Sequence, residues 1–212
     1  MDPSYYDADY FLRGQESGKS LYTDYRWLPD LTVPMAKAIA LHLKMQRGET
    51  VLDFGCARGY LVKALAGIGY RADGYDPSQW VIDHCDPEVA DMVSSSLDPR
   101  RRDWVIAKDV LEHVEHDALH KTIKHLAGIA RKGLFIVVPL SHVEGEPYVV
   151  PEYEKDVTHI IRMPLMGWVR EIYRTLGERR WDVTATYRVE GVKDNYYTNY
   201  PEGNGFITVR PD

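Results

Sequence analysis

The sequence predicts an α/β fold in which a mostly parallel, doubly wound sheet carries helices on both faces. Apolar segments typical of strands alternate with segments of helical spacing. Residues 134–138 (LFIVV) are the most apolar run, as expected of a strand that is covered on both faces. A glycine-bearing turn at residues 55–59 separates a strand from a helix. In open α/β sheets this arrangement forms the crevice that binds a ligand.

The first half of the chain is expected to contribute most of the parallel strands. Residues 1–30 are polar and aromatic and are expected to be irregular, and a helix is expected at 33–45 with Pro34 in its first turn. The elements that follow are a strand at 51–54, a helix at 60–68, a strand at 71–75, a brief helix at 79–85, a weak strand at 89–93 and a strand at 104–107.

The second half completes the sheet and ends differently. The expected elements are a helix at 119–130, the apolar strand at 134–138, a long polar loop at 141–160, a helix at 165–176 that stops at Gly177, and strands at 181–189 and 206–209. The last two segments alternate as antiparallel strands do. Nothing divides the chain, so residues 1–212 are expected to form a single domain.

Composition bounds the class of protein. With 212 residues and a net charge of -6, the chain can bury a substantial core and has no global attraction to a polyanion. Only Cys56 and Cys85 are present, which excludes a disulfide framework and fits a reducing cytoplasm. No run of about 18 apolar residues occurs, so no membrane span is expected.

Three features around the glycine turn discriminate between ligands. Asp76 ends the second strand, where a carboxylate can accept hydrogen bonds from a ribose diol. Asp53 precedes the turn, where it would repel a pyrophosphate but suits a ligand with an ammonium and a sulfonium group. The turn is spaced G-x-x-x-G and lacks the full G-x-G-x-x-G phosphate fingerprint. Together these features favour S-adenosylmethionine over NAD.

Three segments of the sequence resemble the motifs of a known family. Residues 51–59 (VLDFGCARG), 74–78 (GYDPS) and 103–113 (DWVIAKDVLEH) resemble the first, second and fourth-strand motifs of the class I S-adenosylmethionine-dependent methyltransferases. The fourth-strand segment is most similar to the branch that contains ubiquinone-biosynthesis and small-molecule O-methyltransferases. The resemblance implies a Rossmann-like sheet of seven strands with an antiparallel C-terminal pair, and a transferase that uses S-adenosylmethionine.

The cofactor-binding residues implied by these motifs are Asp53, Gly55, Cys56, Ala57, Gly59, Tyr60, Asp76, Pro77, Ser96, Leu97, Lys108, Asp109 and His113. The chain departs from the family at two of these places. Ala57 replaces the middle glycine, which is tolerable if its φ stays negative. The loop that usually offers an acidic or amide side chain to adenine reads Ser95-Ser96-Leu97 here, so backbone groups and Ser96 are expected to take that role. No metal ion is expected.

A hydroxyl acceptor needs a base, because its own pKa lies far above 7. The loop after the fifth strand should face the methyl group, and Asp156-Val-Thr-His159 in it resembles an Asp-x-Thr-His element of small-molecule and sugar methyltransferases. We therefore expect His159 to be the base, with Asp156 or Thr158 orienting the imidazole. His142 is the second choice, and the structural alternative is that His159 caps the helix at 165 or hydrogen-bonds within the loop. Two roles stay open for Glu112, one in the functional site and one that only favours the N-terminal dipole of a helix.

The aromatic ends of the chain are expected to form the acceptor site. Residues 1–32 are expected to act as a lid, and residues 141–164 and 191–205 as acceptor-site loops, because tyrosine and tryptophan faces stack on sugars or bases. The expected substrate-binding residues are Tyr22, Arg26, Trp27, His142 and Tyr197. The predicted function is methyl transfer to a small-molecule or glycan-type acceptor.

Two alternatives stay open. A methyltransferase directed at nucleotides or nucleic acid is disfavoured by the net charge and by Lys108-Asp-Val-Leu where amino-methylating DNA enzymes carry an Asn/Asp-Pro-Pro-Tyr/Phe element. The cluster Arg100-Arg-Arg102 is expected in a solvated loop. The other alternative is a cofactor-binding subunit without turnover of its own. The sequence does not indicate an oligomeric state.

Overall fold

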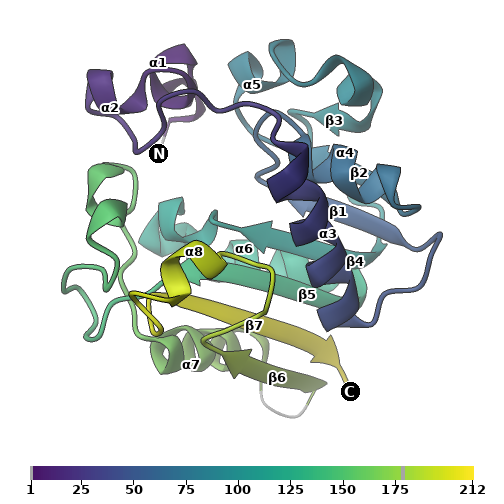
Figure 1. Ribbon diagram of the computed structural model, residues 1–212. Coiled ribbons are helices and arrows are strands. Elements are labelled where there is room, and N and C mark those ends of the chain that lie inside the picture. Colours follow the sequence, from purple (N-terminus) through teal and green to yellow (C-terminus); the bar gives the residue numbers. More distant parts are fainter. Residues whose placement is uncertain (1, 178–179) are drawn as a thin grey trace.

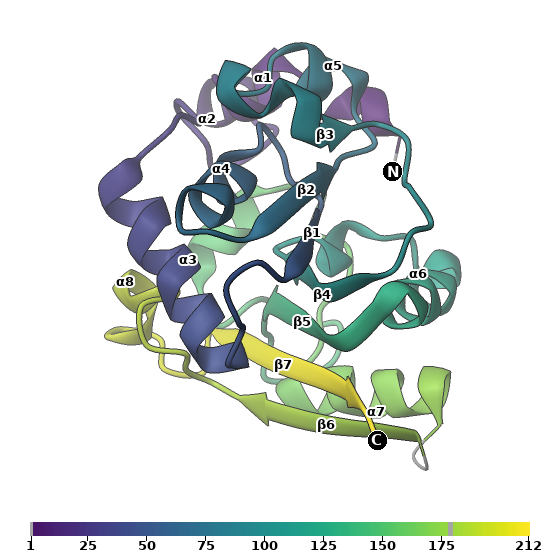
Figure 2. The same ribbon diagram turned by 90° about the vertical axis from the view of Figure 1, so that its right-hand side faces the viewer.

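A computed structural model describes residues 2–177 and 180–212. Its seven strands form one sheet in the order β3-β2-β1-β4-β5-β7-β6 (Figures 1 and 2). The pairs among β1 to β5 are parallel, whereas β7 pairs antiparallel with both β5 and β6. The predicted sheet, mostly parallel with an antiparallel C-terminal pair, is therefore confirmed.

The strands are β1 Thr50–Phe54, β2 Arg71–Tyr75, β3 Val93–Ser94, β4 Arg102–Lys108, β5 Ala130–Pro139, β6 Trp181–Thr186 and β7 Asn204–Pro211. The α-helices are α1 Ala8–Phe11, α2 Gly14–Ser17, α3 Pro29–Leu43, α4 Tyr60–Gly67, α5 Gln79–Asp83, α6 His116–Ile129, α7 Leu165–Leu176 and α8 Asp194–Tyr197. The 3-10 helices are η1 Pro3–Tyr5, η2 Pro87–Met92, η3 Leu111–His113 and η4 Pro151–Lys155.

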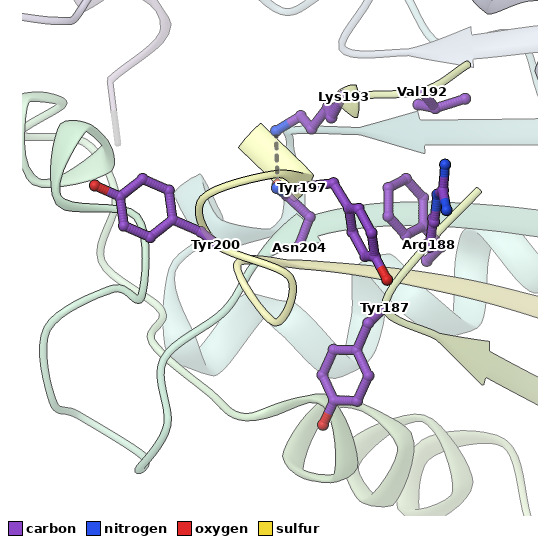
Figure 3. Close-up of a pocket in the computed structure, with 8 residues that line it drawn as sticks. Tyr187, Arg188, Val192, Lys193, Tyr197, Tyr200 and Asn204 are labelled. Atoms are coloured by element: carbon purple, nitrogen blue, oxygen red, sulfur yellow. Dashed lines mark hydrogen bonds between the residues drawn. The ribbon is translucent and has the colours of Figure 1, made fainter. Parts of the chain in front are cut away.

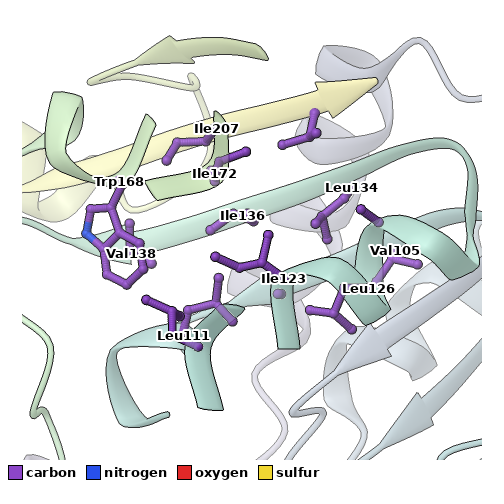
Figure 4. Close-up of a cluster of buried hydrophobic side chains, with 14 of the residues drawn as sticks. Val105, Leu111, Ile123, Leu126, Leu134, Ile136, Val138, Trp168, Ile172 and Ile207 are labelled. Atoms are coloured by element: carbon purple, nitrogen blue, oxygen red, sulfur yellow. The ribbon is translucent and has the colours of Figure 1, made fainter. Parts of the chain in front are cut away.

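Helices cover both faces of the sheet, and β5 shows how its sequence supports this. Leu134, Ile136 and Val138 pack with residues of α6 and α7 in one core cluster (Figure 4). Phe135 and Val137, which alternate with them, pack with residues of α3 and α4 in a second cluster. Successive side chains of a strand point to opposite faces, so the apolar run at 134–138 serves both cores.

Two predicted elements differ in the structure. The predicted strand at 89–93 is mostly the 3-10 helix η2, because Pro87 starts a helical turn and the Asp86 carboxylate accepts from Glu88 N at 3.0 Å. Only Val93–Ser94 pairs with β2. The first long helix begins at Pro29 and not at residue 33, so Pro34 lies inside it and not in its first turn.

The N-terminal segment is more ordered than its sequence indicates. Residues 1–30 were expected to be irregular, but η1, α1 and α2 lie within them. The carboxylates of Asp2 and Asp7 accept from backbone N–H groups at the starts of η1 and α1, as N-caps do. Tyr10 and Phe11 are buried against an aromatic cluster. The packing of aromatic rings therefore orders a segment that has no helical periodicity.

The C-terminal half follows the prediction more closely. Helix α7 spans Leu165–Leu176 and ends at Gly177, whose φ of 81° is a conformation that glycine adopts readily. Strand β6 ends at Thr186 and not at residue 189, and the connecting segment contains α8. In the described ranges 2–177 and 180–212, no helix is long and apolar enough to cross a membrane.

Candidate active site

The predicted crevice lies where the strand order reverses. Strand β1 pairs with β2 on one side and with β4 on the other. The strands that follow β1 in sequence are therefore added first on one side of it and then on the other. The carboxyl ends of these three strands carry the glycine turn, Asp76 and Asp109. Parallel pairing therefore brings three separate sequence motifs to one edge of the sheet.

The glycine turn follows β1 and is built from left-handed residues. Gly55 has φ 77°, Gly59 has φ 78°, and Ala57 between them has φ 46°. The expectation that Ala57 keeps a negative φ is wrong. The reason is the tight turn, in which the Ala57 N–H donates to Asp76 Oδ2 at 3.0 Å. A residue with a Cβ is strained in this conformation.

Two aspartates flank the turn and are buried. Asp53 is 5% exposed and Asp76 is 7% exposed. Burial raises the pKa of Asp53 to about 7, and Asp76 raises it further while Lys108 opposes the shift. Burial also raises the pKa of Asp76 to about 6, against two backbone hydrogen bonds that lower it. Carboxylates whose ionised form is destabilised in this way fit a positively charged ligand such as S-adenosylmethionine, which would restore their charge.

The N-terminal segment lies over the same edge (Figure 1). Ser78 Oγ donates to the Tyr6 carbonyl at 2.7 Å, and Arg58 donates to the Tyr25 carbonyl at 3.1 Å. The ring of Tyr25 stacks on Tyr60, with centroids 5.2 Å apart. These contacts hold the segment against the glycine turn and the helix that follows it.

A second group of polar side chains is centred on the buried Asp156. Its Oδ2 accepts from the hydroxyl of Tyr10 at 2.5 Å, across 146 residues of sequence. Its Oδ1 accepts from the N–H of Thr158 at 3.0 Å and from the hydroxyl of Thr158 at 2.6 Å. The N-terminal segment and the loop after β5 are therefore joined at one carboxylate.

His159 is 7% exposed and is held by its Nδ1, which lies 2.9 Å from the Tyr153 carbonyl. Since a carbonyl only accepts, Nδ1 carries the proton and Nε2 keeps a lone pair. Nε2 lies 3.8 Å from Asp156 Oδ2 and 4.0 Å from Glu112 Oε1. Burial lowers the pKa of His159, against the nearby Asp156 and Asp109 charges, so the ring is neutral near pH 7.

Two expectations about this histidine need correction. The group that orients it is the Tyr153 carbonyl, neither Asp156 nor Thr158, and Thr158 contacts the other histidine instead. His159 does not cap the helix, because α7 has Pro164 at its N-cap. The structure instead has the other alternative, a hydrogen bond within the loop, from His159 to the Tyr153 carbonyl.

Glu112 and His113 reach the same place from η3. The Glu112 carbonyl accepts from Ile160 N at 2.9 Å and from Ile161 N at 3.0 Å, which draws the loop beside η3. His113 Nδ1 lies 2.6 Å from Thr158 Oγ1. The rings of His113 and His159 meet edge to face with centroids 4.7 Å apart. Burial, and then His159, lower the pKa of His113 to about 4.

Asp109 lies between two lysines. Its φ of 56° follows the end of β4, and its carboxylate pairs with Lys108 and with Lys193. Burial alone would raise the pKa of Asp109, but these two ammonium groups hold it well below its usual range. Lys193 was not anticipated from the sequence. It lies in the segment 191–205, and no spacing pattern marks it.

Several predicted acceptor and cofactor residues lie outside these two groups. Arg26 and His142 are exposed and pair with Asp24 and Glu202. Ser96 is exposed, and Leu97 packs partly against the core. Trp27 packs under Lys63 and beside Tyr60.

Tyr22 and Tyr197 are the remaining residues predicted to bind the acceptor. Tyr22 is partly buried and packs against Tyr10, Phe11 and Tyr25. Burial raises its pKa, and Asp109 and Asp156 raise it further. Tyr197 lines a small pocket with Arg188, whose guanidinium lies 4.6 Å from the ring centroid (Figure 3).

The chain was compared with known proteins. A ubiquinone biosynthesis O-methyltransferase from Paraburkholderia phytofirmans is 29% identical over 107 residues, which are 45% of this chain and 46% of that protein. The match therefore spans less than half of the relative. A S-adenosylmethionine-dependent methyltransferase structure from Archaeoglobus fulgidus has a TM-score of 0.63 at 17% identity, covering 86% of this chain and 94% of that one.

Magnesium protoporphyrin IX methyltransferase from Synechocystis PCC 6803, solved with bound S-adenosylmethionine, has a TM-score of 0.61 at 16% identity. That match covers 99% of this chain and 97% of the other. At these identities the structures show a shared fold, which confirms the Rossmann-like class. Asp53 and Asp76 lie at the edge of this sheet where the strand order reverses.

The family follows from the sequence match. Residues 30–176 match the model of a family described as a methyltransferase domain. The chain belongs to this family, which confirms the predicted methyltransferase class.

Proposed function

We propose that this protein moves the methyl group of S-adenosylmethionine to a hydroxyl oxygen of a small-molecule or sugar-type acceptor, with His159 as the general base. The observation that supports this is the buried, neutral imidazole whose Nδ1–H is donated to the Tyr153 carbonyl. Its Nε2 lone pair is thus available to take the hydroxyl proton as the methyl group is transferred.

On the donor side, Asp53 and Asp76 are the groups that would hold the cofactor. Asp76 would accept from the ribose hydroxyls, and Asp53 would face the methionine ammonium. Both aspartates are buried at the edge that also carries the β4 end. Methyl transfer is an in-line displacement, so the contribution of this edge is to hold donor and acceptor in line and away from water.

On the acceptor side, the aromatic N-terminal segment supports a small substrate. Tyr22 lies among buried rings, and Tyr10 ties the segment to Asp156. Such surfaces can stack on a sugar or an aromatic ring while hydroxyl groups hydrogen-bond to it. The curated relative is named an O-methyltransferase, which supports oxygen as the methylated atom.

A nucleic-acid acceptor has less support from the structure. Within the cluster expected in a solvated loop, Arg102 is 3% exposed and pairs with Asp73, so that expectation is wrong for this residue. Arg101 donates to the Ala130 carbonyl, and Arg100 pairs with Asp98. These cations are used within the chain and do not form a free basic face.

The test joins a binding measurement to a turnover measurement. Calorimetry with S-adenosylhomocysteine measures cofactor binding, and mass spectrometry of a panel of hydroxylated metabolites and sugar nucleotides incubated with S-adenosylmethionine detects a mass gain of one methylene. We expect His159→Ala to reduce turnover by about 10²- to 10⁴-fold and to leave the dissociation constant of S-adenosylhomocysteine within about twofold.

His142→Ala is the matched control, because it removes an exposed histidine from the same loop. It should leave turnover unchanged. Undiminished turnover in His159→Ala would exclude this residue as the base. Tight binding of S-adenosylhomocysteine without methylation of any hydroxylated acceptor would instead favour the cofactor-binding subunit.

A further inference from the structure

Glu112 has a buried carboxylate that nothing in the described part of the chain satisfies. The residue is 0% exposed, and neither Oε1 nor Oε2 has a hydrogen-bond partner among the described residues. Buried polar groups are nearly always hydrogen-bonded, so an unpaired carboxylate indicates a missing partner. A cation or a hydrogen-bond donor would complete this site.

The two histidines beside Glu112 are both arranged as acceptors. His159 donates its Nδ1–H to the Tyr153 carbonyl, 2.9 Å away. The single hydroxyl hydrogen of Thr158 points to Asp156, at 2.6 Å, so Thr158 Oγ1 accepts from His113 Nδ1. Each imidazole therefore presents an Nε2 lone pair. Rings whose other N–H is donated to a carbonyl, or to a group backed by a carboxylate, are the usual arrangement of histidines that bind a metal ion.

The three side chains converge. One ligand atom from each of Glu112, His113 and His159 lies within 4.8 Å of the others, and His159 Nε2 lies 4.0 Å from Glu112 Oε1. Around a tetrahedral zinc ion, donors at bond lengths near 2.0–2.1 Å are separated by about 3.3 Å. Side-chain shifts of about an ångström would therefore bring these donors to a metal ion.

We propose that Glu112, His113 and His159 form a binding site for one divalent transition-metal ion of the zinc class. Two imidazoles and one carboxylate suit zinc, and three protein ligands leave a position open. Thr158 and the Tyr153 carbonyl hold the two rings from behind, and Asp156 adds negative charge 3.8 Å from His159 Nε2. No metal was expected from the sequence, because these ligands come from segments 46 residues apart that only the fold brings together.

Metal binding bears on the proposed reaction but does not depend on it. The Nε2 lone pair of His159 can hold an ion or take a proton, and not both at once. Replacement of His159 removes a metal ligand and the proposed base together. A loss of turnover therefore cannot test the metal site. The decisive measurement is binding of the metal alone.

The experiment uses the full chain without an affinity tag, first stripped by a chelator. Zn²⁺ binding is measured by competition with a chromophoric chelator, and Co²⁺ is added as a spectroscopic probe of nitrogen and oxygen ligands. We expect one ion per chain. Glu112→Gln and His159→Gln should each weaken Zn²⁺ binding by at least 100-fold, and Thr158→Val, which releases His113, by about 10- to 100-fold.

The control is a second histidine–carboxylate pair on the surface. His142 lies 3.7 Å from Glu202 and is exposed, so His142→Ala should leave Zn²⁺ binding unchanged. Circular dichroism and thermal unfolding of each metal-free variant show whether it is folded. Glu112→Gln should be, because the amide has nearly the same size as the carboxyl group that it replaces. Absence of saturable binding, or equal binding by the wild type, Glu112→Gln and His159→Gln, would overturn the metal site. Saturable zinc binding by a protein whose metal-free form transfers no methyl group would leave the site standing and refute only the proposed function.

Discussion

The two groups of the candidate site are built in different ways. The cofactor side consists of short continuous motifs, in which Asp76 accepts from the N–H groups of Ala57 and Ser78 in turns next to the strand ends. The proposed acceptor side is assembled from distant segments, since Tyr10 meets Asp156, and Glu112 meets His159, only in the folded chain.

This difference has a physical consequence. On the cofactor side, the backbone satisfies Asp76, and the raised pKa of both aspartates comes mainly from burial. On the proposed acceptor side, polar side chains such as Thr158 and Asp156 hydrogen-bond to one another. The Glu112 carboxyl group has no hydrogen-bond partner among the described residues. Single substitutions on the cofactor side should therefore change ligand binding, whereas those on the acceptor side should also change the stability of the fold.

The largest effect on the cofactor side is expected from Asp76→Ala. It removes the carboxylate that we propose accepts from the ribose, so the dissociation constant of S-adenosylhomocysteine should rise by about 100-fold. Calorimetry measures this, and Asp83→Ala, an exposed aspartate on the neighbouring helix α5, is the control. An unchanged dissociation constant in Asp76→Ala would remove the basis for the assigned cofactor crevice.

On the acceptor side, Tyr10→Phe tests whether the N-terminal segment is held by Asp156. The variant deletes a buried hydrogen bond to a carboxylate, so the free energy of unfolding should fall by about 1–3 kcal/mol. Urea denaturation measures it. Tyr187→Phe, at a tyrosine that is 40% exposed, should be neutral. Equal stability of the two variants would mean that the segment is not held at this carboxylate.

The pH dependence of cofactor binding separates the two groups further. Asp53 has a pKa of about 7, and its ionised form attracts the cationic ligand. The dissociation constant of S-adenosylmethionine should therefore decrease as pH rises towards 7, by up to about tenfold per pH unit, and level off above it. Calorimetry between about pH 5.5 and 8.5, a range that spans this pKa, measures the effect. In Asp53→Asn the dependence near pH 7 should vanish, and only the part near pH 6 that comes from Asp76 should remain. Persistence of the dependence near pH 7 would mean that another group is responsible.

The smallest effect concerns the glycine turn. Ala57 has φ 46°, so Ala57→Gly should relieve strain and raise the free energy of unfolding by about 0.5–1 kcal/mol. Ala64→Gly within helix α4 is a control of opposite sign, because glycine destabilises a helix interior by about 1 kcal/mol. A loss of stability in Ala57→Gly would contradict the strained turn.

Local patterns predicted most of the fold. The strand at 71–75 and the helix at 165–176 have the expected bounds, because periodicity and a terminal glycine define them within a few residues. The strand expected at 89–93 failed because Pro87 and Asp86 favour a helical turn over a short apolar run. The order of the N-terminal segment could not be read from periodicity, since stacking of rings on distant helices stabilises it.

Residues within a few positions of one another were enough to predict most of the strands, the glycine turn and the two aspartates that flank it. They also placed His159 in the loop that follows the fifth strand. The folded structure was needed to show that the Tyr153 carbonyl orients this ring and that Thr158 accepts from His113. It also decided that Glu112 is buried without a partner. The reason is that a hydrogen bond across many residues depends on how β4, β5 and their loops pack, and no local spacing records that.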